Sequence, residues 1–359
     1  MRVAFVTELF YPSIGGQEYR FMQLARGMMR RRIEVDIYTT DHLGSLPSED
    51  HVNGISIYRY VRLRSYVKPG SRSIIQLLKF IHATNSLLGK INKSYDYIFL
   101  NEMPIMHLYF IRNYTNLIID WCEAYQGGLL KFLLLPAAKR FIRGIAVSEE
   151  IRDIIYAYNS KAEITVIRTP IDVNPYICNT QEKDKENIVY IGRLVPHKNL
   201  LNLVKAIMYI NKRYSRCFIK LNIAGDGPLK TRLLQYAKTG CISVLGKVSE
   251  QEKIQLLTNA FLLAIPSLRE GFPNVVAEAI ASCTPILTVM AKFNNVFKFV
   301  RRHGIGFASP SPDYIDIANT ILNITHDEWL HASIREQRLR EEFTEEKVIT
   351  NLIRYLTRG

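Results

Sequence analysis

The chain has 359 residues, of which 48% are hydrophobic and 22% charged, values that are ordinary for a folded globular protein. This length exceeds what one hydrophobic core usually supports, so we expect two domains rather than one. The formal net charge of +14 favours an anionic partner, whether a phosphate-bearing ligand, a membrane surface or a nucleic acid.

The five cysteines are scattered and contain no CxxC pair: Cys122, Cys178, Cys217, Cys241 and Cys283. This pattern predicts reduced thiols rather than a disulfide framework or a zinc site. The chain enters a strand almost at once and shows no signal peptide. Its longest apolar run, near residues 127–138, is interrupted by Lys131 and is too short to cross a bilayer. We expect a cytoplasmic protein, either free or peripheral on the cytoplasmic face of a membrane.

The first half of the chain alternates short strands with helices. Residues 3–6 form a strand, the pair Gly15 and Gly16 opens a helix over 17–32, and residues 33–38 form the next strand. The free amides at a helix N-terminus favour a phosphate there, although glycines at a turn are also commonly structural. Further strands are expected at 97–100, 117–119 and 144–147, with Ser148 capping the helix that follows.

Two stretches of the first half carry basic residues and no acidic ones. The first, residues 51–95, contains a helix expected at 74–81 with apolar residues on much of its surface. Its basic residues are Arg59, Arg62, Arg64, Lys68, Arg72, Lys79, Lys90 and Lys93. The second, residues 124–148, places Lys131, Lys139, Arg140 and Arg143 beside leucine-rich sequence. Such stretches bind anionic lipid, with about 1 kcal/mol from each basic residue near the surface. The alternative is a helix packed on its own domain with a solvated basic rim.

The periodicity stops at residues 171–186, which contain Pro175 and a run of charged residues and are typical of a linker. A second series of strands follows, at 188–191, 218–224, 243–245, 261–265, 284–290 and 306–308, with Asn199 capping a helix to Arg213. Two such series predict an α/β fold with two doubly wound, Rossmann-like domains, residues 1–170 and 187–340, facing a central cleft. Residues 341–359 are expected to form a C-terminal helix, with packing on the N-terminal domain as one option.

Two glutamates lie between the strand at 261–265 and the end of the helix expected at 275–282. Glu270 stands in the loop and Glu278 just inside the helix. Ligands of open α/β sheets lie at the carboxyl ends of strands, against helix N-termini. Two carboxylates there suit a polyhydroxylated ligand, because each accepts hydrogen bonds from hydroxyl groups. The alternative is that Glu270 is solvated and Glu278 pairs locally.

Four motifs, in this order, resemble those of the retaining glycosyltransferases of family 4, which have the GT-B fold. Residues 10–18 are similar to an F-x-P-x-x-G-G-x-E loop, residues 190–199 to a G-R-L-x-x-x-K-N loop, and residues 223–228 to an I-x-G-x-G-P turn. Glu270 and Glu278 are similar to the family's E-x7-E pair. The resemblance implies transfer of a sugar, with retention, from a nucleotide diphosphate sugar to a hydroxyl of a glycan or lipid-linked glycan. It implies no metal and no other cofactor.

The resemblance also implies a role for each motif residue. Arg193 and Lys198 would hold the donor diphosphate and stabilise its departure. Glu278 would bind the ribose hydroxyls, and Glu270 the donor sugar. The other residues expected around the donor are Gly15, Gly16, Gly192, Gly225, Gly227, Gly271, Phe272, Pro273, Asn274 and Val275.

The main departure from the family is Cys122, which stands where a histidine commonly reaches the donor sugar. A thiol is a poor hydrogen-bond partner. Either Asp120 or Glu123 takes over that role, or the choice of donor changes, or catalysis is weakened. Residues 290–302 also lack the family's glycine-rich loop, and residues 167–172 lack its Asn-Gly turn.

Two other readings of the same motifs stay open. One is a nucleotide-sugar epimerase on the same fold, and the other a catalytically weakened nucleotide-sugar-binding partner protein. We expect no nucleic-acid partner, because nucleic acid would account for the charge but for none of the four motifs.

Overall fold

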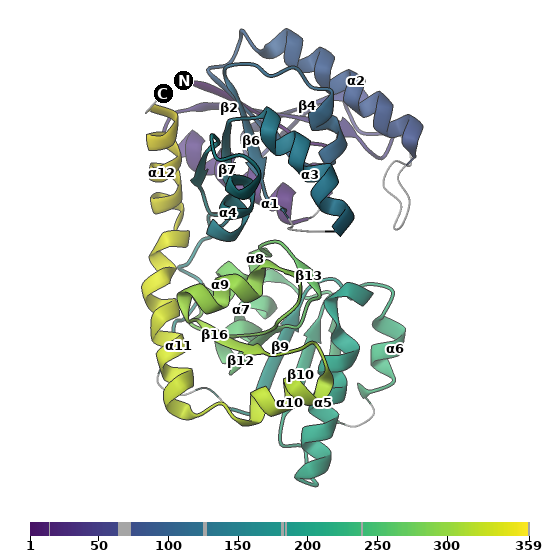
Figure 1. The fold of residues 1–359 in the computed structure, drawn as a ribbon, viewed down its shortest axis with the longest axis vertical. Coiled ribbons are helices and arrows are strands. Elements are labelled where there is room, and N and C mark those ends of the chain that lie inside the picture. The colour runs from purple at the N-terminus through teal and green to yellow at the C-terminus, as the bar shows by residue number, and fades with distance from the viewer. Residues whose placement is uncertain are drawn as a thin grey trace. The chain divides into compact units, whose positions relative to one another are not determined.

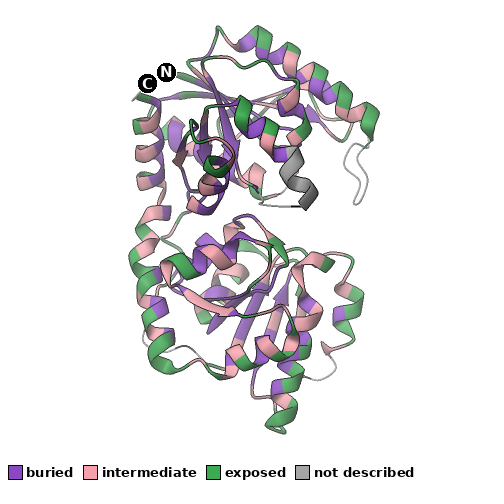
Figure 2. Ribbon diagram, in the orientation of Figure 1, coloured by how far each residue is buried: buried purple, intermediate pink, exposed green. Residues whose placement is uncertain are grey.

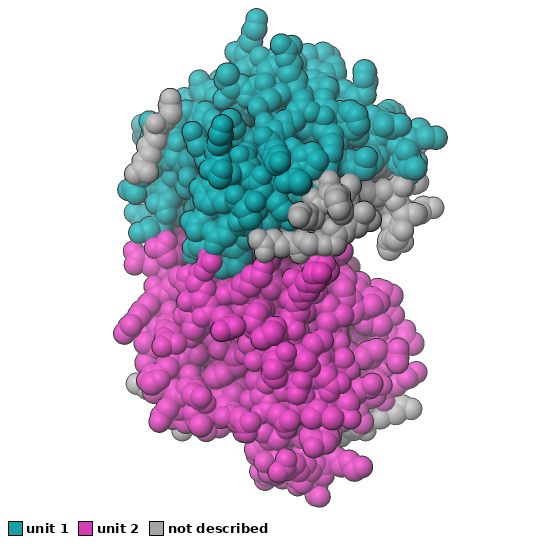
Figure 3. Space-filling model, viewed as in Figure 1, with its two compact units in different colours: residues 1–170, 345–359 teal, residues 171–344 magenta. Residues whose placement is uncertain are grey.

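The computed structural model describes residues 1–13, 15–63, 73–124, 128–180, 183, 185–237 and 240–357, without the side chains of residues 128–133. Among the basic residues named above, Arg64, Lys68, Arg72 and the side chain of Lys131 lie outside the described residues. The chain divides into two compact units (Figure 3). Unit 1 comprises Met1–Pro170 and Glu345–Gly359, and unit 2 comprises Ile171–Thr344.

Unit 1 is built on a sheet whose strands, within the described residues, follow the order β3-β4-β2-β1-β5-β6-β7-β8 (Figure 1). The pairs are parallel except β3 with β4. The strands are β1 (Arg2–Val6), β2 (Glu34–Asp41), β3 (Glu49–Val52), β4 (Ile55–Arg62), β5 (Tyr97–Asn101), β6 (Leu117–Trp121), β7 (Arg143–Ala146) and β8 (Glu163–Val166). The sequence pattern did not predict β3, β4 or β8. In β4, buried and less buried positions alternate, but one of the buried positions is Arg59, so the apolar pattern in the sequence is interrupted.

The helices of unit 1 include one from the far end of the sequence. They are α1 (Gly16–Arg30), α2 (Ile74–Ile91), η1 (Ile105–Tyr109), α3 (Gly128–Arg140), α4 (Glu149–Tyr158) and α12 (Glu345–Thr357). α12 supplies Val348, Ile349, Leu352 and Leu356 to the core around β1 and α1. A Cβ atom on Gly27 of α1 would lie 2.5 Å from Cγ1 of Ile349, so the close approach of α12 requires a glycine there.

Unit 2 is built on a parallel sheet with the order β11-β10-β9-β12-β14-β16 in its described part. Its strands are β9 (Asn187–Ile191), β10 (Lys220–Ala224), β11 (Ile242–Gly246), β12 (Leu262–Ile265), β14 (Ile286–Val289) and β16 (Gly306–Ser309), with a separate pair, β13 (Arg269–Glu270) and β15 (Phe293–Asn294). The helices are η2 (Pro196–Lys198), α5 (Leu200–Arg213), α6 (Lys230–Leu234), α7 (Glu250–Asn259), α8 (Asn274–Ala281), α9 (Asn295–His303), α10 (Tyr314–Leu322), α11 (His326–Leu339) and η4 (Arg340–Phe343).

Each unit is an α/β layered structure of the predicted class. The strands are mostly buried, whereas many residues of α2 and α11 are exposed (Figure 2). In unit 1 the strand order reverses between β1 and β5, and in unit 2 between β9 and β12. Ligands of doubly wound sheets bind at the carboxyl ends of strands at such reversals. The loops after β1, β5, β9 and β12 are therefore where a site is expected in each unit.

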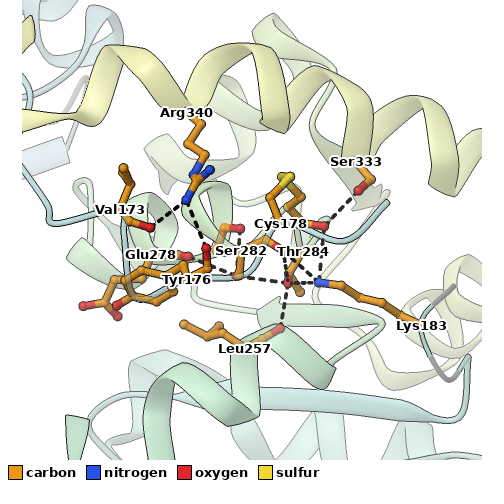
Figure 4. Close-up of a disulfide and its surroundings, with 12 residues drawn as sticks. Val173, Tyr176, Cys178, Lys183, Leu257, Glu278, Ser282, Thr284, Ser333 and Arg340 are labelled. Atoms are coloured by element: carbon orange, nitrogen blue, oxygen red, sulfur yellow. Dashed lines mark hydrogen bonds between the residues drawn. A yellow bond between two sulfur atoms is a disulfide. The ribbon is translucent and has the colours of Figure 1, made fainter. Parts of the chain in front are cut away.

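The structure groups the segment after Pro170 with unit 2. The amide of Ile171 donates a hydrogen bond to the carbonyl of Phe343 at 2.9 Å. Arg340 donates to the carbonyl oxygens of Val173 and Tyr176 at 2.6 and 3.0 Å (Figure 4). This segment is thus held against η4, the last element before the chain returns to unit 1.

The prediction of reduced thiols is wrong for four of the five cysteines. Cys178 forms a disulfide with Cys283, and Cys217 with Cys241, with Cα–Cα distances of 4.9 and 5.5 Å. Cys122 is free. The partners lie 105 and 24 positions apart, so only the folded chain brings them together. The cysteine pattern consequently gives no support for a reducing compartment.

Lys183 lies buried beside the first disulfide (Figure 4). Its Nζ donates to the carbonyl of Ser282 at 2.9 Å and to the hydroxyl of Thr284 at 2.5 Å. Burial lowers the pKa of this ammonium to about 8. Together with the disulfide, these bonds fasten the segment after Pro170 to the chain that leaves the C-terminal end of α8.

Candidate active site

Three glycines shape the loops that follow β9 and β10. Gly192, Gly225 and Gly227 have φ values of 154°, 141° and 151°, which residues with a Cβ atom rarely adopt. A Cβ on Gly225 would lie 1.8 Å from the carbonyl oxygen of Gly192. The two loops are joined by the bond from the amide of Leu194 to the carbonyl of Asp226, at 2.9 Å. The predicted donor-binding glycines are therefore needed for two backbones to pack together.

Lys198 and Glu270 form an ion pair at the reversal of the strand order in unit 2. Each side chain keeps 12% exposure. The loops that carry them are joined by the bond from the amide of Leu268 to the carbonyl of His197, at 2.8 Å. Burial, with the cations Lys198 and Arg269 nearby, lowers the pKa of His197. The structure thus brings together a cation and a carboxylate that the sequence predicts as site residues.

Arg193 lies on the same loop as Lys198 and is exposed. Its backbone is fixed, because the hydroxyl of Tyr190 donates to the Arg193 carbonyl at 2.8 Å. The guanidinium has no salt-bridge partner among the residues that the structure describes. An anchored backbone with an unengaged cation leaves this side chain able to bind an anion.

The loop from Gly271 to Val275 leads into α8. Phe272 packs edge-on against Phe299 with ring centroids 4.8 Å apart, and it stacks on Phe343 at 6.0 Å. Pro273 is the N-cap residue of α8, and Asn274 its first residue. The first amides of a helix lack partners within the helix and attract anions. Because Phe272 is anchored, this helix start is held in one place.

Glu278 lies in α8 and is 5% exposed. Its Oε1 accepts a bond from Nζ of Lys253, on α7, at 2.8 Å. Burial raises the pKa of Glu278, and the charge of Lys253 opposes that rise. The carboxylate is therefore neither a helix cap nor solvated. Its ion pair with Lys253 is the local pairing that the sequence offered as an alternative role for Glu278.

In unit 1, Gly15 and Gly16 stand at the start of α1, with Gly15 as its N-cap residue. A Cβ on Gly15 would lie 2.4 Å from Oε2 of Glu18, whose other oxygen accepts a bond from the hydroxyl of Ser13 at 2.8 Å. The glycine pair thus belongs to a turn closed by Glu18. A phosphate role and a structural role are compatible here.

Asp120 is fully buried at the end of β6 and pairs with Arg20 of α1. Arg20 donates to both carboxylate oxygens, with Nε–Oδ2 at 2.9 Å and Nη2–Oδ1 at 2.8 Å. A bidentate pair of this kind occupies both oxygens. Arg20 therefore engages both oxygens of Asp120, and the pair joins β6 to α1.

Cys122 is half-buried and lies beside the glycine turn. Its thiol donates to Oε1 of Gln17, the residue after Gly16, at 2.9 Å, and Gln17 also donates to Asp120 at 3.4 Å. Burial, with Asp120 and Glu102 nearby, raises the pKa of the thiol well above its ordinary value. The thiol is therefore protonated at neutral pH, so Cys122 is no activated nucleophile.

Glu102, which the sequence did not single out, supports the loop that carries Cys122. It is fully buried, and its Oε1 accepts from the amides of Cys122 and Glu123 at 3.0 and 2.7 Å. Burial and the nearby Asp120 raise its pKa well above the ordinary value. The sequence indicated Glu102 as a site residue only by its position, directly after β5 at the reversal of the strand order.

The described part of the chain offers neither a metal-binding cluster nor a membrane-spanning helix. It contains no group of three or more His, Cys, Asp or Glu side chains able to hold a metal ion. No helix there is long and apolar enough to span a bilayer.

Two families of known proteins match most of the chain between them. The family described as Glycosyltransferase Family 4 matches residues 14–175, and the family described as Glycosyl transferases group 1 matches residues 178–345. The chain is 24% identical to the phosphatidylinositol N-acetylglucosaminyltransferase gpi3 subunit of Schizosaccharomyces pombe, over 94% of this chain and 75% of that protein. It is also 24% identical to the GDP-mannose:cellobiosyl-diphosphopolyprenol alpha-mannosyltransferase of Xanthomonas campestris, over 82% and 80%.

The fold has counterparts among solved structures. The complex of Anabaena Alr3699/HepE with UDP-glucose matches all of both chains with a TM-score of 0.71 at 17% identity, which supports the fold. The predicted GT-B fold, with two Rossmann-like domains, is confirmed. The chain belongs to glycosyltransferase family 4 and is a glycosyltransferase.

Proposed function

We propose that the protein transfers a sugar from a nucleoside diphosphate sugar to a hydroxyl of a glycan or lipid-linked glycan, with retention and without a metal. The observation that carries this proposal is the pair of lysine–glutamate contacts in unit 2. Lys198 pairs with Glu270 in the loops after β9 and β12, and Lys253 pairs with Glu278 in α8. A site of this composition can bind hydroxyl groups through its carboxylates and phosphates through its cations.

In the proposed reaction, the bond between the sugar C1 and the β-phosphate oxygen breaks, a bond from C1 to the acceptor oxygen forms, and the proton of the acceptor hydroxyl passes to the departing diphosphate. Negative charge develops on the departing diphosphate. Arg193 and Lys198 stabilise that charge, and Glu270 exchanges its contact with Lys198 for the sugar hydroxyls. Glu278 binds the ribose, and the amides at the start of α8 bind phosphate oxygens.

The acceptor is proposed to be lipid-linked and to reach unit 1 from an anionic membrane on its cytoplasmic face. The first turns of α2 support this, because Ile74, Ile75 and Leu78 are 74%, 77% and 57% exposed. Lys79 follows them directly. The Xanthomonas relative acts, by its name, on a diphosphopolyprenol acceptor. Exposed apolar residues beside basic ones are typical of a surface that lies on lipid headgroups.

A second candidate is a nucleotide-sugar-binding partner protein with weak catalysis of its own. Cys122 favours it, because a protonated thiol bonded to Gln17 cannot share a positive charge with a donor sugar as a histidine can.

The two glutamates give the decisive test. We expect Glu278→Ala to weaken binding of the nucleoside diphosphate by about tenfold or more, since a charged partner of the ribose is lost. Glu270→Ala should leave that affinity within about twofold and abolish turnover, because its contact is with the sugar. Thermal shift with uridine, guanosine, adenosine and thymidine diphosphates identifies the base, and release of that diphosphate from its sugar conjugates measures turnover.

Normal turnover by both variants would show that the site has been assigned wrongly. Binding of a diphosphate with no turnover by the wild-type protein, across its sugar conjugates and a lipid-linked acceptor, would favour the second candidate.

A further inference from the structure

Lys253 lies in the first turn of α7 and bridges two glutamates. Its Nζ is 2.8 Å from Oε1 of Glu278 and 2.7 Å from Oε2 of Glu250. The side chain of Glu278 is 6% exposed and that of Glu250 is 79% exposed, so one contact is internal and the other lies at the surface. The internal contact is the one that bears on the site.

The position of Lys253 runs against the local preference of the helix. The N-terminal turn of a helix carries a partial positive charge, so a cation there is disfavoured. The rest of this turn follows the preference, with a capping box between Ser249 and Glu252. A residue that breaks a local rule inside an otherwise regular element usually serves a contact elsewhere. Here that contact is with Glu278.

Glu278 needs such a partner in order to accept hydrogen bonds from hydroxyl groups. A buried carboxyl without a cation tends to take up a proton, and the neutral form is the weaker acceptor. Lys253 occupies Oε1 only. Within the described ranges, no other side chain bonds to this carboxylate. Oε2 is therefore left for a ligand.

We propose that Lys253 is a positioning residue that holds Glu278 ionised and in a fixed orientation for the two ribose hydroxyls of the donor. This inference rests on the proposed function, because it requires a nucleoside diphosphate in the site. It makes the Lys253–Glu278 pair the feature that distinguishes a ribose from a sugar without those hydroxyls.

The test compares uridine and guanosine diphosphates with their 2′,3′-dideoxy analogues by titration calorimetry. We expect the wild-type protein to bind the ribose form at least about tenfold more tightly, the size of a charge-assisted contact. Lys253→Met should weaken binding of the ribose form by about tenfold and leave the dideoxy form unchanged. Lys253→Arg should restore most of the loss, because it keeps the charge. These effects should appear in KM for the donor rather than in kcat.

Two matched variants complete the test. Glu250→Gln removes the surface partner of Lys253 and should leave both affinities unchanged. In a Glu278→Gln background, Lys253→Met should add no further loss, because both changes remove one interaction.

Equal binding of the ribose and dideoxy forms by the wild-type protein would overturn the inference without any variant. It would also remove the ribose contact given to Glu278, and it would leave the proposed sugar transfer standing. An equal loss for both forms in Lys253→Met would also overturn it, since Lys253 would then act on the phosphates or on the fold. Failure of the wild-type protein to bind any of the four nucleoside diphosphates would remove the proposed function and this inference together.

Discussion

At the scale of single residues, both site glutamates are paired with lysines. Lys198 is paired with Glu270, and Lys253 with Glu278. A ligand that offers both phosphates and hydroxyl groups can replace the first pair without leaving a charge unpaired, whereas a neutral sugar or a lone phosphate cannot. The arrangement therefore favours a ligand that carries both groups at once.

Cys122 gives a test of whether the site has been rebuilt around a thiol. Its Sγ already lies 2.9 Å from Gln17, and an imidazole is larger than a thiol. We expect Cys122→His to lower turnover by about tenfold or more, because Gln17 must move. Cys122→Ser, which keeps the size and a donor, should stay within a few-fold of the wild type. Release of nucleoside diphosphate measures both.

Combining Cys122→His with Gln17→Ala should recover part of the lost turnover, because the smaller side chain makes room for the ring. A rise in turnover for Cys122→His alone would contradict this expectation and would support a site weakened by the loss of a histidine.

The sequence predicted Glu270, Glu278, Arg193 and Lys198 as site residues, because motif spacing is visible along the chain. It could not predict their contacts. Lys253 precedes Glu278 by 25 positions, and Lys198 precedes Glu270 by 72, so only the packing of separate loops and helices reveals the pairs. Glu102 was not predicted for the same reason, since the amide that it binds belongs to Cys122, 20 positions further along the chain.

At the scale of elements, the alternation of short apolar runs predicted most strands of both sheets within a few residues. The helix expected at 74–81 extends to Ile91 as α2. Asn199 stands at the predicted N-cap of α5, but its side chain donates to the carbonyl of Pro312 rather than capping the helix. Propensity gives the place of such a residue, and tertiary contacts decide what its side chain does.

The two disulfides give a prediction about the stability of unit 2. In the chain-entropy account, closing loops of 105 and 24 residues contributes about 4.8 and about 3.4 kcal/mol. Cys178→Ser should therefore lower the midpoint of thermal unfolding more than Cys217→Ser under oxidising conditions. With a thiol reductant present, both variants should unfold close to the reduced wild-type protein. Differential scanning calorimetry measures the unfolding midpoints of the wild-type protein and of the two variants. Equal midpoints with and without reductant would show that the disulfides are absent or contribute nothing.

At the scale of the whole molecule, the excess of basic residues is proposed to direct the protein to anionic lipid. Co-sedimentation with vesicles that contain phosphatidylserine should show binding at low salt and loss of binding at high salt, since exposed charges are screened. Ile75→Glu in α2 should reduce the bound fraction several-fold, because it places a charge in the apolar contact.

Leu234→Glu is the matched control, because Leu234 is an exposed leucine of unit 2, at 45%, and lies outside α2. It should bind vesicles as the wild type does. Absence of sedimentation at either salt concentration would remove the membrane proposal, and equal effects of the two substitutions would show that α2 is not the contact.

The place of α12 in unit 1 also bears on the order in which the protein is made. Unit 2 is one continuous stretch, Ile171–Thr344, whereas the core of unit 1 needs Val348, Ile349, Leu352 and Leu356. A ribosome releases residues in sequence order, at about 5–20 per second. Unit 2 is therefore complete first, and the N-terminal sheet, although synthesised earliest, waits for α12 before its apolar surface is covered. Chaperones that bind exposed apolar surface during translation should accordingly meet unit 1 for longer than unit 2.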